Sequence, residues 1–350
     1  MGAVETVESA AVGAVARARE LAAQLSREAP RLEREGVTRA DTDRLAAAGL
    51  HAVSGPTELG GLDRPGQRAV AELLAGSSPD VWFVWFQHAA VVRLLAASEN
   101  LPLAERHLAA LCAGSTQGGV AFSHLRTGRP SIAAARIKGG WSLSGTQPWC
   151  TGWPLIDLVL VGAVAPATDE VVFGLTPAGD RPALHSTGEL RLAAMGGTST
   201  HALRLDNVLL GDADVVLRTD YSAWRQRDGD ANANVQPSTF GVALAALALL
   251  DLPSPATAES LRARVFAVRS QAYALLDEVP PAEAVAERLA LRAGALVLGL
   301  EAATALLAAR GGQGMDLDDP AQLLLRAAAF QLVHAQAPHV RAATLAALAA

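Results

Sequence analysis

Lysine is nearly absent from this sequence of 350 residues: Lys138 is the single example among 29 basic residues, and cysteine occurs only twice. The arginines are scattered and the net charge is −6, so we expect no nucleic-acid partner. Cys112 and Cys150 form neither a disulfide framework nor a metal-ligand spacing, which is typical of a reducing compartment. The first residues lack a basic segment followed by an apolar one, so no secretory signal is expected and we predict a cytoplasmic protein.

Charged residues are also few, at 18%, whereas hydrophobic residues make up 51% of the chain. Single cores stop growing at roughly 250–300 residues, so two or three domains are expected. We predict a homodimer or homotetramer, with part of the apolar surface between subunits. Arg292 and Glu301 interrupt the apolar segment 289–309, which favours a buried bundle helix over a membrane span.

Apolar spacing divides the chain into three segments. Residues 1–117 have helical periodicity, residues 118–216 consist of short β-forming runs with turn signals, and residues 217–350 return to helical patterns. No helical patterns lie between the strands, which argues against a Rossmann unit. The predicted fold class is α+β: an N-terminal α-helical domain, a central antiparallel β barrel or sandwich, and a C-terminal helical bundle.

Four motifs occur in a defined order along the chain. GLHAVSGPTELGG begins at Gly49, GGWSLSGTQPWCTGWPLIDLVLVGA spans Gly139–Ala163, LAAMGGTSTHALRLDNVLL begins at Leu192, and RGGQGM spans Arg310–Met315. Together they resemble motifs of the acyl-CoA dehydrogenase superfamily, including its G-x-x-L-x-G-x-K-x-W-x-T-x-G segment and its GGxGf loop. By this resemblance, the chain is identified as a divergent member of that superfamily.

The resemblance implies FAD, held between the β domain and the C-terminal bundle. In that arrangement Trp149 covers one face of the isoalloxazine ring, the Thr151 hydroxyl donates to the reduced ring near N5, and Ser123 contacts the pyrimidine end. Core packing of Trp149 and a turn role for Ser123 remain alternatives. A glycine loop would either approach the cofactor of a neighbouring subunit or cap the preceding helix. Its members are Gly311, Gly312 and Gly314.

Two cofactor motifs of the superfamily are altered. The T-E-P-x-x-G-S-D motif corresponds to SHLRTGRP at residues 123–130, which lacks the acid and the phosphate-facing serine. Arg129 or Arg126 would neutralise a diphosphate instead, unless both are solvated loop residues. The R-x-x-F-G element has no counterpart in residues 249–268. These departures predict weakly bound FAD, or flavin supplied in its reduced form.

The glutamate that removes the acyl α-proton in relatives is also missing. Ala335 and Gln236 align with the two positions that carry it, and neither side chain accepts a proton at pH 7. His334 and His88 are therefore the candidate catalytic residues, because histidine titrates near neutral pH. A hydrogen-bonded packing role remains the alternative for both.

Three functions remain open. The first is an FAD-dependent oxidoreductase that acts on an acyl thioester or related small organic substrate by hydride transfer to flavin N5, with an electron-transfer partner. The second is a reduced-flavin-dependent monooxygenase with C4a-hydroperoxide chemistry, served by a flavin reductase. It fits the missing glutamate and the lack of a nicotinamide-binding fingerprint. The third is a flavin-poor, non-catalytic scaffold or partner subunit, which fits the altered cofactor motifs.

Overall fold

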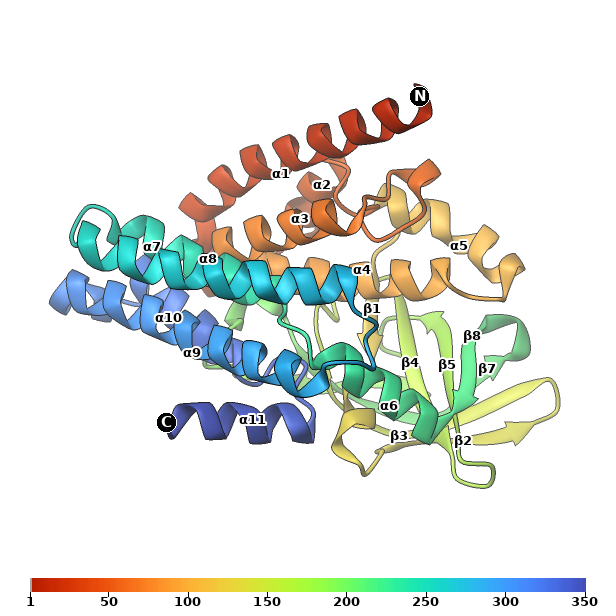
Figure 1. The fold of residues 1–350 in the computed structure, drawn as a ribbon. Coiled ribbons are helices and arrows are strands. Elements are labelled where there is room, and N and C mark those ends of the chain that lie inside the picture. Colours follow the sequence, from red (N-terminus) through yellow and green to blue (C-terminus); the bar gives the residue numbers. More distant parts are fainter. Residues whose placement is uncertain (1) are drawn as a thin grey trace.

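The computed structural model describes the backbone of residues 2–350 and the side chains from residue 12 onward. Helices occupy both ends of the chain and a sheet lies between them (Figure 1), so the predicted α+β fold class is confirmed. The N-terminal helices are α1 (Gly2–Glu35), α2 (Arg39–Ala47), α3 (Arg64–Ser77), α4 (Pro79–Ala96) and α5 (Leu101–Ala113).

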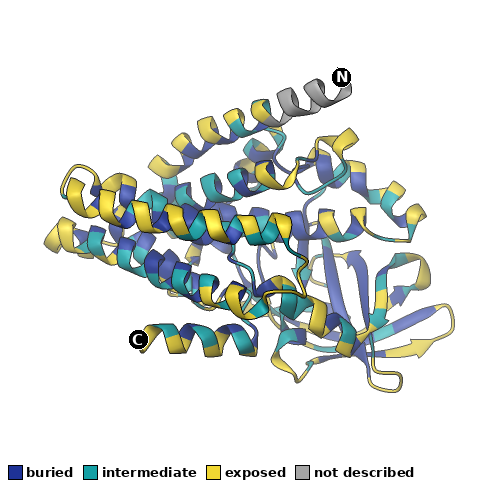
Figure 2. Ribbon diagram, in the orientation of Figure 1, coloured by how far each residue is buried: buried dark blue, intermediate teal, exposed yellow. Residues whose placement is uncertain are grey.

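Helix α4 is central to the molecule and buried along most of its length (Figure 2). Its start follows from sequence: the Ser78 hydroxyl accepts a hydrogen bond from the amide of Val81, and Pro79 occupies the first turn, where no amide donor is needed. Because the helix is apolar on nearly every side, it packs against the other helices and against the sheet.

The described residues contain an eight-stranded mixed sheet with the order β6-β7-β3-β2-β4-β5-β8, in which β1 pairs with β4. The prediction of a purely antiparallel domain was wrong, because β4 runs parallel to both β1 and β2. The antiparallel strand β3 lies between β2 and β4 in the chain, so the chain runs in the same direction in β2 and β4. The strands are β1 (Gly118–Ala121), β2 (Ile132–Ile137), β3 (Gly140–Cys150), β4 (Leu158–Ala165), β5 (Glu170–Pro177), β6 (Leu184–Glu189), β7 (His201–Gly211) and β8 (Val215–Asp220).

The C-terminal helices do not form a separate core. Leu25 and Leu74 of the first segment belong to the same buried cluster as Phe240 and Leu298 of the last segment. The two helical segments therefore enclose one core, with the β domain packed at its side (Figure 1). The C-terminal helices are α6 (Tyr221–Asn232), α7 (Pro237–Leu250), α8 (Pro255–Glu278), α9 (Val285–Arg310), α10 (Pro320–Gln331) and α11 (Pro338–Leu348).

Two glycines allow α3 and α7 to cross in direct backbone contact. A Cβ atom on Gly241 would lie 2.2 Å from the carbonyl oxygen of Glu72, and one on Gly76 would lie 2.6 Å from the carbonyl oxygen of Gly241. No side chain fits into these spaces. The crossing joins the first and last segments of the chain.

Within the described residues, the stretches 221–250 and 285–315 are long and apolar enough to cross a membrane. However, 67% and 50% of their most apolar windows are buried inside the protein. The predicted bundle helix at 289–309 corresponds to α9, which packs against α7, α8, α10 and α11. Burial of this kind is typical of a core helix in a bundle.

Candidate functional site

Trp149 and Thr151 lie at the end of β3, where its pairing with β7 is irregular. From Gln147 to Cys150, β3 advances by three residues while β7 advances by two, so β3 contains a bulge. A bulge redirects the side chains beside it. The Trp149 side chain is 51% exposed, whereas Thr151 is only 5% exposed. The core-packing alternative for Trp149 is therefore wrong, because about half of this residue is exposed.

The Thr151 hydroxyl belongs to a buried chain of hydroxyl groups. Its Oγ1 lies 3.1 Å from Oγ1 of Thr200, which in turn lies 2.8 Å from Oγ1 of Thr198. Thr198 donates to the carbonyl oxygen of Met195 at 2.7 Å. Thr198 and Thr200 were not predictable from sequence motifs, because residues nearly 50 positions from Thr151 meet it only after the sheet has formed.

Ser123 is placed beside the same strand. Its Oγ accepts a hydrogen bond from Nε2 of Gln147 at 2.9 Å, and the same nitrogen donates to the carbonyl oxygen of Trp149. Gln147 is fully buried, and its Oε1 has no hydrogen-bond partner among the described residues. An unpaired buried acceptor is costly unless a ligand or water satisfies it. Gln147 thus links Ser123 to Trp149 and keeps one buried acceptor without a partner.

The predicted diphosphate-binding arginines are positioned differently from one another. Arg126 forms two hydrogen bonds of 2.8 Å with the carboxylate of Asp228 on α6. Its charge is already compensated, so an anion would have to displace Asp228. Arg129 is exposed, and its side chain has no hydrogen bond to any described residue. The solvated-loop alternative therefore describes the position of Arg129.

The glycine loop follows the end of α9. Gly311 has a positive φ of 58°, and its amide donates to carbonyl groups of the last helical turn, as in the predicted helix cap. Cβ atoms on Gly311 and Gly312 would meet nothing within 4 Å, whereas one on Gly314 would lie 2.7 Å from Leu307. Packing within the chain thus requires a glycine only at Gly314, and the exposed backbone of the other two remains accessible to a ligand or partner.

His334 is enclosed by aromatic rings. The ring centres of Trp82, Phe83 and Phe86 lie 5.3, 5.5 and 5.1 Å from that of His334, and Phe330 stacks on it at 5.5 Å. Burial, reinforced by nearby Arg292 and Arg126, lowers the pKa of His334 to about 3. Its Nδ1 has no partner among the described residues. At pH 7 this imidazole is neutral and a weak base.

Arg292 lies beside Ala335, one of the two positions that the sequence resemblance aligned with the missing glutamate. Its guanidinium donates to the carbonyl oxygens of His334 at 2.8 Å, Ala335 at 3.4 Å and Asn234 at 3.3 Å. Burial, followed by Arg126, lowers its pKa to about 10, so it remains charged at neutral pH. Arg292 therefore links the backbone at Ala335 to the backbone at Asn234, two residues before Gln236. Its isolated position in an apolar segment was the only sequence signal for this role.

His88 lies on α4 and contacts the start of β1. Its side chain is 1% exposed, and its Nδ1 accepts a hydrogen bond from the amide of Gly118 at 3.0 Å. Burial, followed by the neighbouring His51, lowers the pKa of His88 well below its ordinary value. The hydrogen-bonded packing alternative is met at Nδ1 alone, because Nε2 has no partner among the described residues, and the catalytic role of His88 stays a prediction.

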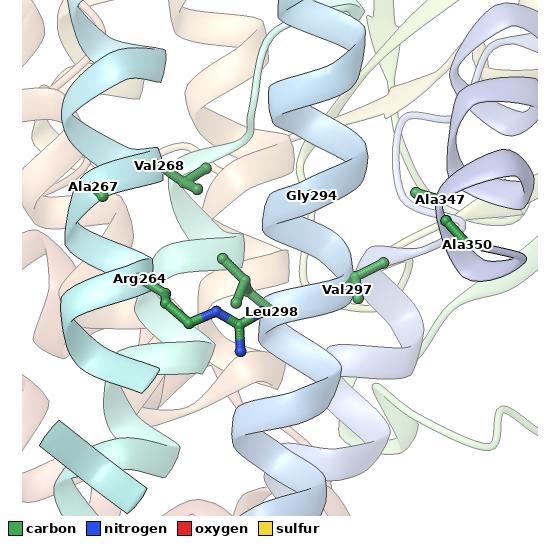
Figure 3. Close-up of a pocket in the computed structure, with 8 residues that line it drawn as sticks. All are labelled: Arg264, Ala267, Val268, Gly294, Val297, Leu298, Ala347 and Ala350. Atoms are coloured by element: carbon green, nitrogen blue, oxygen red, sulfur yellow. The ribbon is translucent and has the colours of Figure 1, made fainter. Parts of the chain in front are cut away.

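Two cavities of the described residues are lined by residues other than Trp149, Thr151 and His334. A cavity of about 520 Å³ lies between Arg126, α6 and the first turns of α9 and α11. An apolar groove of about 450 Å³ lies between α8, α9 and α11 (Figure 3). Its lining residues are Arg264, Ala267, Val268, Gly294, Val297, Leu298, Ala347 and Ala350.

No protein-family model matches the sequence, and no curated protein matches it. Solved structures do resemble it. Butyryl-CoA dehydrogenase from Megasphaera elsdenii has a TM-score of 0.79 at 14% identity, and the match covers 97% of this chain and 98% of that chain. Dibenzothiophene monooxygenase from Paenibacillus sp. A11-2 has a TM-score of 0.75 at 18% identity, with 92% and 93% covered.

A chain of the ChsE4-ChsE5 complex from Mycobacterium tuberculosis is also similar, with a TM-score of 0.73 at 20% identity over 97% of this chain and 95% of that one. These likenesses show that the chain has the acyl-CoA dehydrogenase fold over nearly its whole length. Structures with this fold include both a dehydrogenase and a monooxygenase, so the choice between these chemistries depends on the side chains.

Proposed function

We propose that the chain is a flavin-dependent oxidoreductase whose flavin lies against Trp149 and Thr151. The half-exposed indole of Trp149 carries this proposal, because an apolar ring of that size is normally covered when nothing binds to it. Gln147, whose Nε2 donates to Ser123, adds a buried and unpaired Oε1, an acceptor that a ring N–H group would satisfy. A bound flavin would supply the redox chemistry that no side chain of this site provides.

FAD is the proposed cofactor, with weak binding of its phosphate and adenine end. Asp228 already neutralises Arg126, and Arg129 is solvated, so little positive charge remains free for a diphosphate. Gly311 and Gly312 present an open backbone that a neighbouring subunit's cofactor would reach in a homodimer or homotetramer. Most of the binding free energy is therefore assigned to the isoalloxazine ring.

Replacement of Trp149 by alanine is expected to weaken flavin binding about tenfold, since loss of an aromatic stacking partner costs about 0.5–1.5 kcal/mol beyond the area buried. Fluorescence titration with FAD and with FMN measures the change. Leu209→Ala is the matched control, because Leu209 is another exposed apolar residue of the β domain, at 71% exposure. Equal affinities for the two variants would remove Trp149 from the site.

The geometry favours reduced-flavin monooxygenation over dehydrogenation of an acyl thioester. Ala335 and Gln236 provide no carboxylate, Arg292 holds the backbone beside them, and His334 is a poor base because its pKa is about 3. A positioned base typically contributes 10²–10⁴-fold to proton abstraction. The related fold of dibenzothiophene monooxygenase, also solved with FMN and indole, is consistent with this choice. The proposed partner is then a flavin reductase of the same cytoplasmic compartment.

Anaerobic mixing of the flavin-loaded protein with saturated acyl-CoA thioesters is expected to leave the flavin absorbance unchanged, because no group is placed to remove the α-proton. Stopped-flow spectroscopy at 450 nm measures this directly, with a known acyl-CoA dehydrogenase as positive control. Rapid bleaching would instead establish thioester dehydrogenation. If the chain binds neither oxidised nor reduced flavin, the non-catalytic scaffold becomes the better account.

A further inference from the structure

The hydroxyl chain at Thr151 has a fixed direction. A carbonyl oxygen only accepts hydrogen bonds, so Thr198 must give its proton to Met195. Thr198 can then only accept from Thr200, and Thr200, having given away its single proton, can only accept from Thr151. The Thr151 hydroxyl therefore donates inward to Thr200. Its oxygen keeps lone pairs for an outside donor, but it has no proton left to give.

The loop that carries Met195, the last acceptor in the chain of hydroxyl groups, is fixed by contacts with α4 and α1. The amide of Gly197, in the same loop as Met195, donates to Oδ1 of Asp80 on α4 at 2.8 Å, and its carbonyl accepts from Val37 at 2.7 Å. A Cβ atom on Gly197 would lie 2.0 Å from the carbonyl oxygen of Leu32, so the loop sits directly on α1.

The three threonines and Met195 are buried. Reversing the direction of donation would break the 2.7 Å hydrogen bond from Thr198 to Met195, and a hydrogen bond contributes about 0.5–1.5 kcal/mol to stability. The observed direction is therefore the preferred one.

We infer that this chain of hydroxyl groups makes the site selective for the reduced form of flavin. The inference rests on the proposed docking of flavin at Trp149 and Thr151. The reduced ring carries an N–H group at position 5, which the Thr151 oxygen can accept. The oxidised ring has only a lone pair at that nitrogen. This lone pair would face the lone pairs of the Thr151 oxygen and receive no hydrogen bond. This corrects the prediction that Thr151 donates to the reduced ring, because its proton is already committed to Thr200.

Thr198→Val tests the direction of the chain without touching the ligand. Without the Thr198 oxygen, Thr200 has no inward acceptor and is free to donate to Thr151, which can then donate to the oxidised ring. The ratio of the dissociation constants for oxidised and dithionite-reduced FMN is expected to fall about tenfold, which corresponds to a decrease of about 30 mV in the two-electron midpoint potential of the bound flavin. Thr198→Ser keeps the hydroxyl and should retain the wild-type ratio.

Binding of 5-deaza-FMN to the wild-type protein provides a test that requires no substitution at a buried position. Its ring has carbon at position 5, so neither redox form offers an N–H group there, and the preference for the reduced form should disappear. A Thr198→Val ratio equal to that of Thr198→Ser, or an undiminished preference with 5-deaza-FMN, overturns the inference while leaving flavin binding established. Failure of the wild-type protein to bind FMN in either form instead contradicts the proposed function itself.

Discussion

Gly241→Ala is expected to destabilise the protein by about 3 kcal/mol or more. The new methyl group would lie 2.2 Å from the carbonyl oxygen and 2.9 Å from the carbonyl carbon of Glu72, so α7 and α3 would have to separate. Overpacking a core typically costs about 1–3 kcal/mol. Here the obstacle is backbone, and no side-chain rotation relieves it, so the cost should lie at or above the top of that range. Urea unfolding followed by circular dichroism measures the change.

Gly294→Ala is the matched control, because Gly294 also lies within a long C-terminal helix. A Cβ atom there would meet nothing within 4 Å. Alanine is favoured over glycine inside helices by roughly 0.5–1 kcal/mol, so this variant should be slightly more stable than the wild type. If the two glycine variants have similar stabilities, α3 and α7 do not cross in direct backbone contact.

The order of helical, β and helical segments was predictable because each segment has its own local signature. Helical spacing gives way to β-forming runs near Gly118, and helical patterns return after the sheet, so periodicity alone indicates the fold class. The shared core was not predictable, since it depends on packing between residues more than 150 positions apart, such as Leu74 and Phe240. Length suggested separate domains, but the two helical segments pack as one body.

Helix α6 shows how the position of one helix changes the interpretation of a site. Its sequence, YSAWRQRDGDAN, is polar and contains a glycine, so it has little helical periodicity. Asp220 nevertheless caps it by accepting from the amide of Ala223 at 2.7 Å. Because α6 supplies Asp228, the charge of Arg126 is neutralised by the chain itself. The sequence indicated a free arginine, and only the position of α6 reveals its partner.

Candidate residues near position 150 were predictable from motif spacing, but their hydrogen bonding was not. The sequence pointed to Trp149 and Thr151, and the structure places one half-exposed and the other buried at the same bulge. The direction of the hydroxyl chain depends on a single carbonyl group, that of Met195, in a loop about 45 residues further on. Motifs identify residue types at a site, whereas proton positions follow from contacts made after folding.

Acidification from pH 7 to pH 5 is expected to destabilise the protein by several kcal/mol. Burial lowers the pKa of His51 and His124 to about 4 and that of His334 to about 3, and it also lowers the pKa of His88. In the unfolded chain these groups titrate near 6.5. Between those values the unfolded state binds more protons, so stability falls as the pH falls. A histidine with a folded pKa of about 4 loses roughly 2 kcal/mol between pH 6.5 and pH 5.

Asp80 opposes this trend. Burial, followed by the nearby Glu33, raises its pKa to about 7, and its Oδ2 has no partner among the described residues. Between its unfolded pKa and about 7 the folded state binds more protons, so this group alone would stabilise the protein as the pH falls. The slope per group is the same for Asp80 and for each histidine. Protonation of Asp80 therefore offsets the destabilisation caused by about one of the four histidines, and the net effect of acidification remains destabilising.

His334→Phe isolates one contribution. The replacement keeps an aromatic ring among Trp82, Phe86 and Phe330 but removes the group that must charge on unfolding. The loss of unfolding free energy between pH 7 and pH 5, measured by urea titration at each pH, should shrink by roughly 2 kcal/mol relative to wild type. Phe83→Leu, which alters the same aromatic enclosure but removes no titratable group, should leave the full pH dependence in place. An unchanged pH dependence in His334→Phe would mean that the imidazole is solvated, which would restore it as a candidate base.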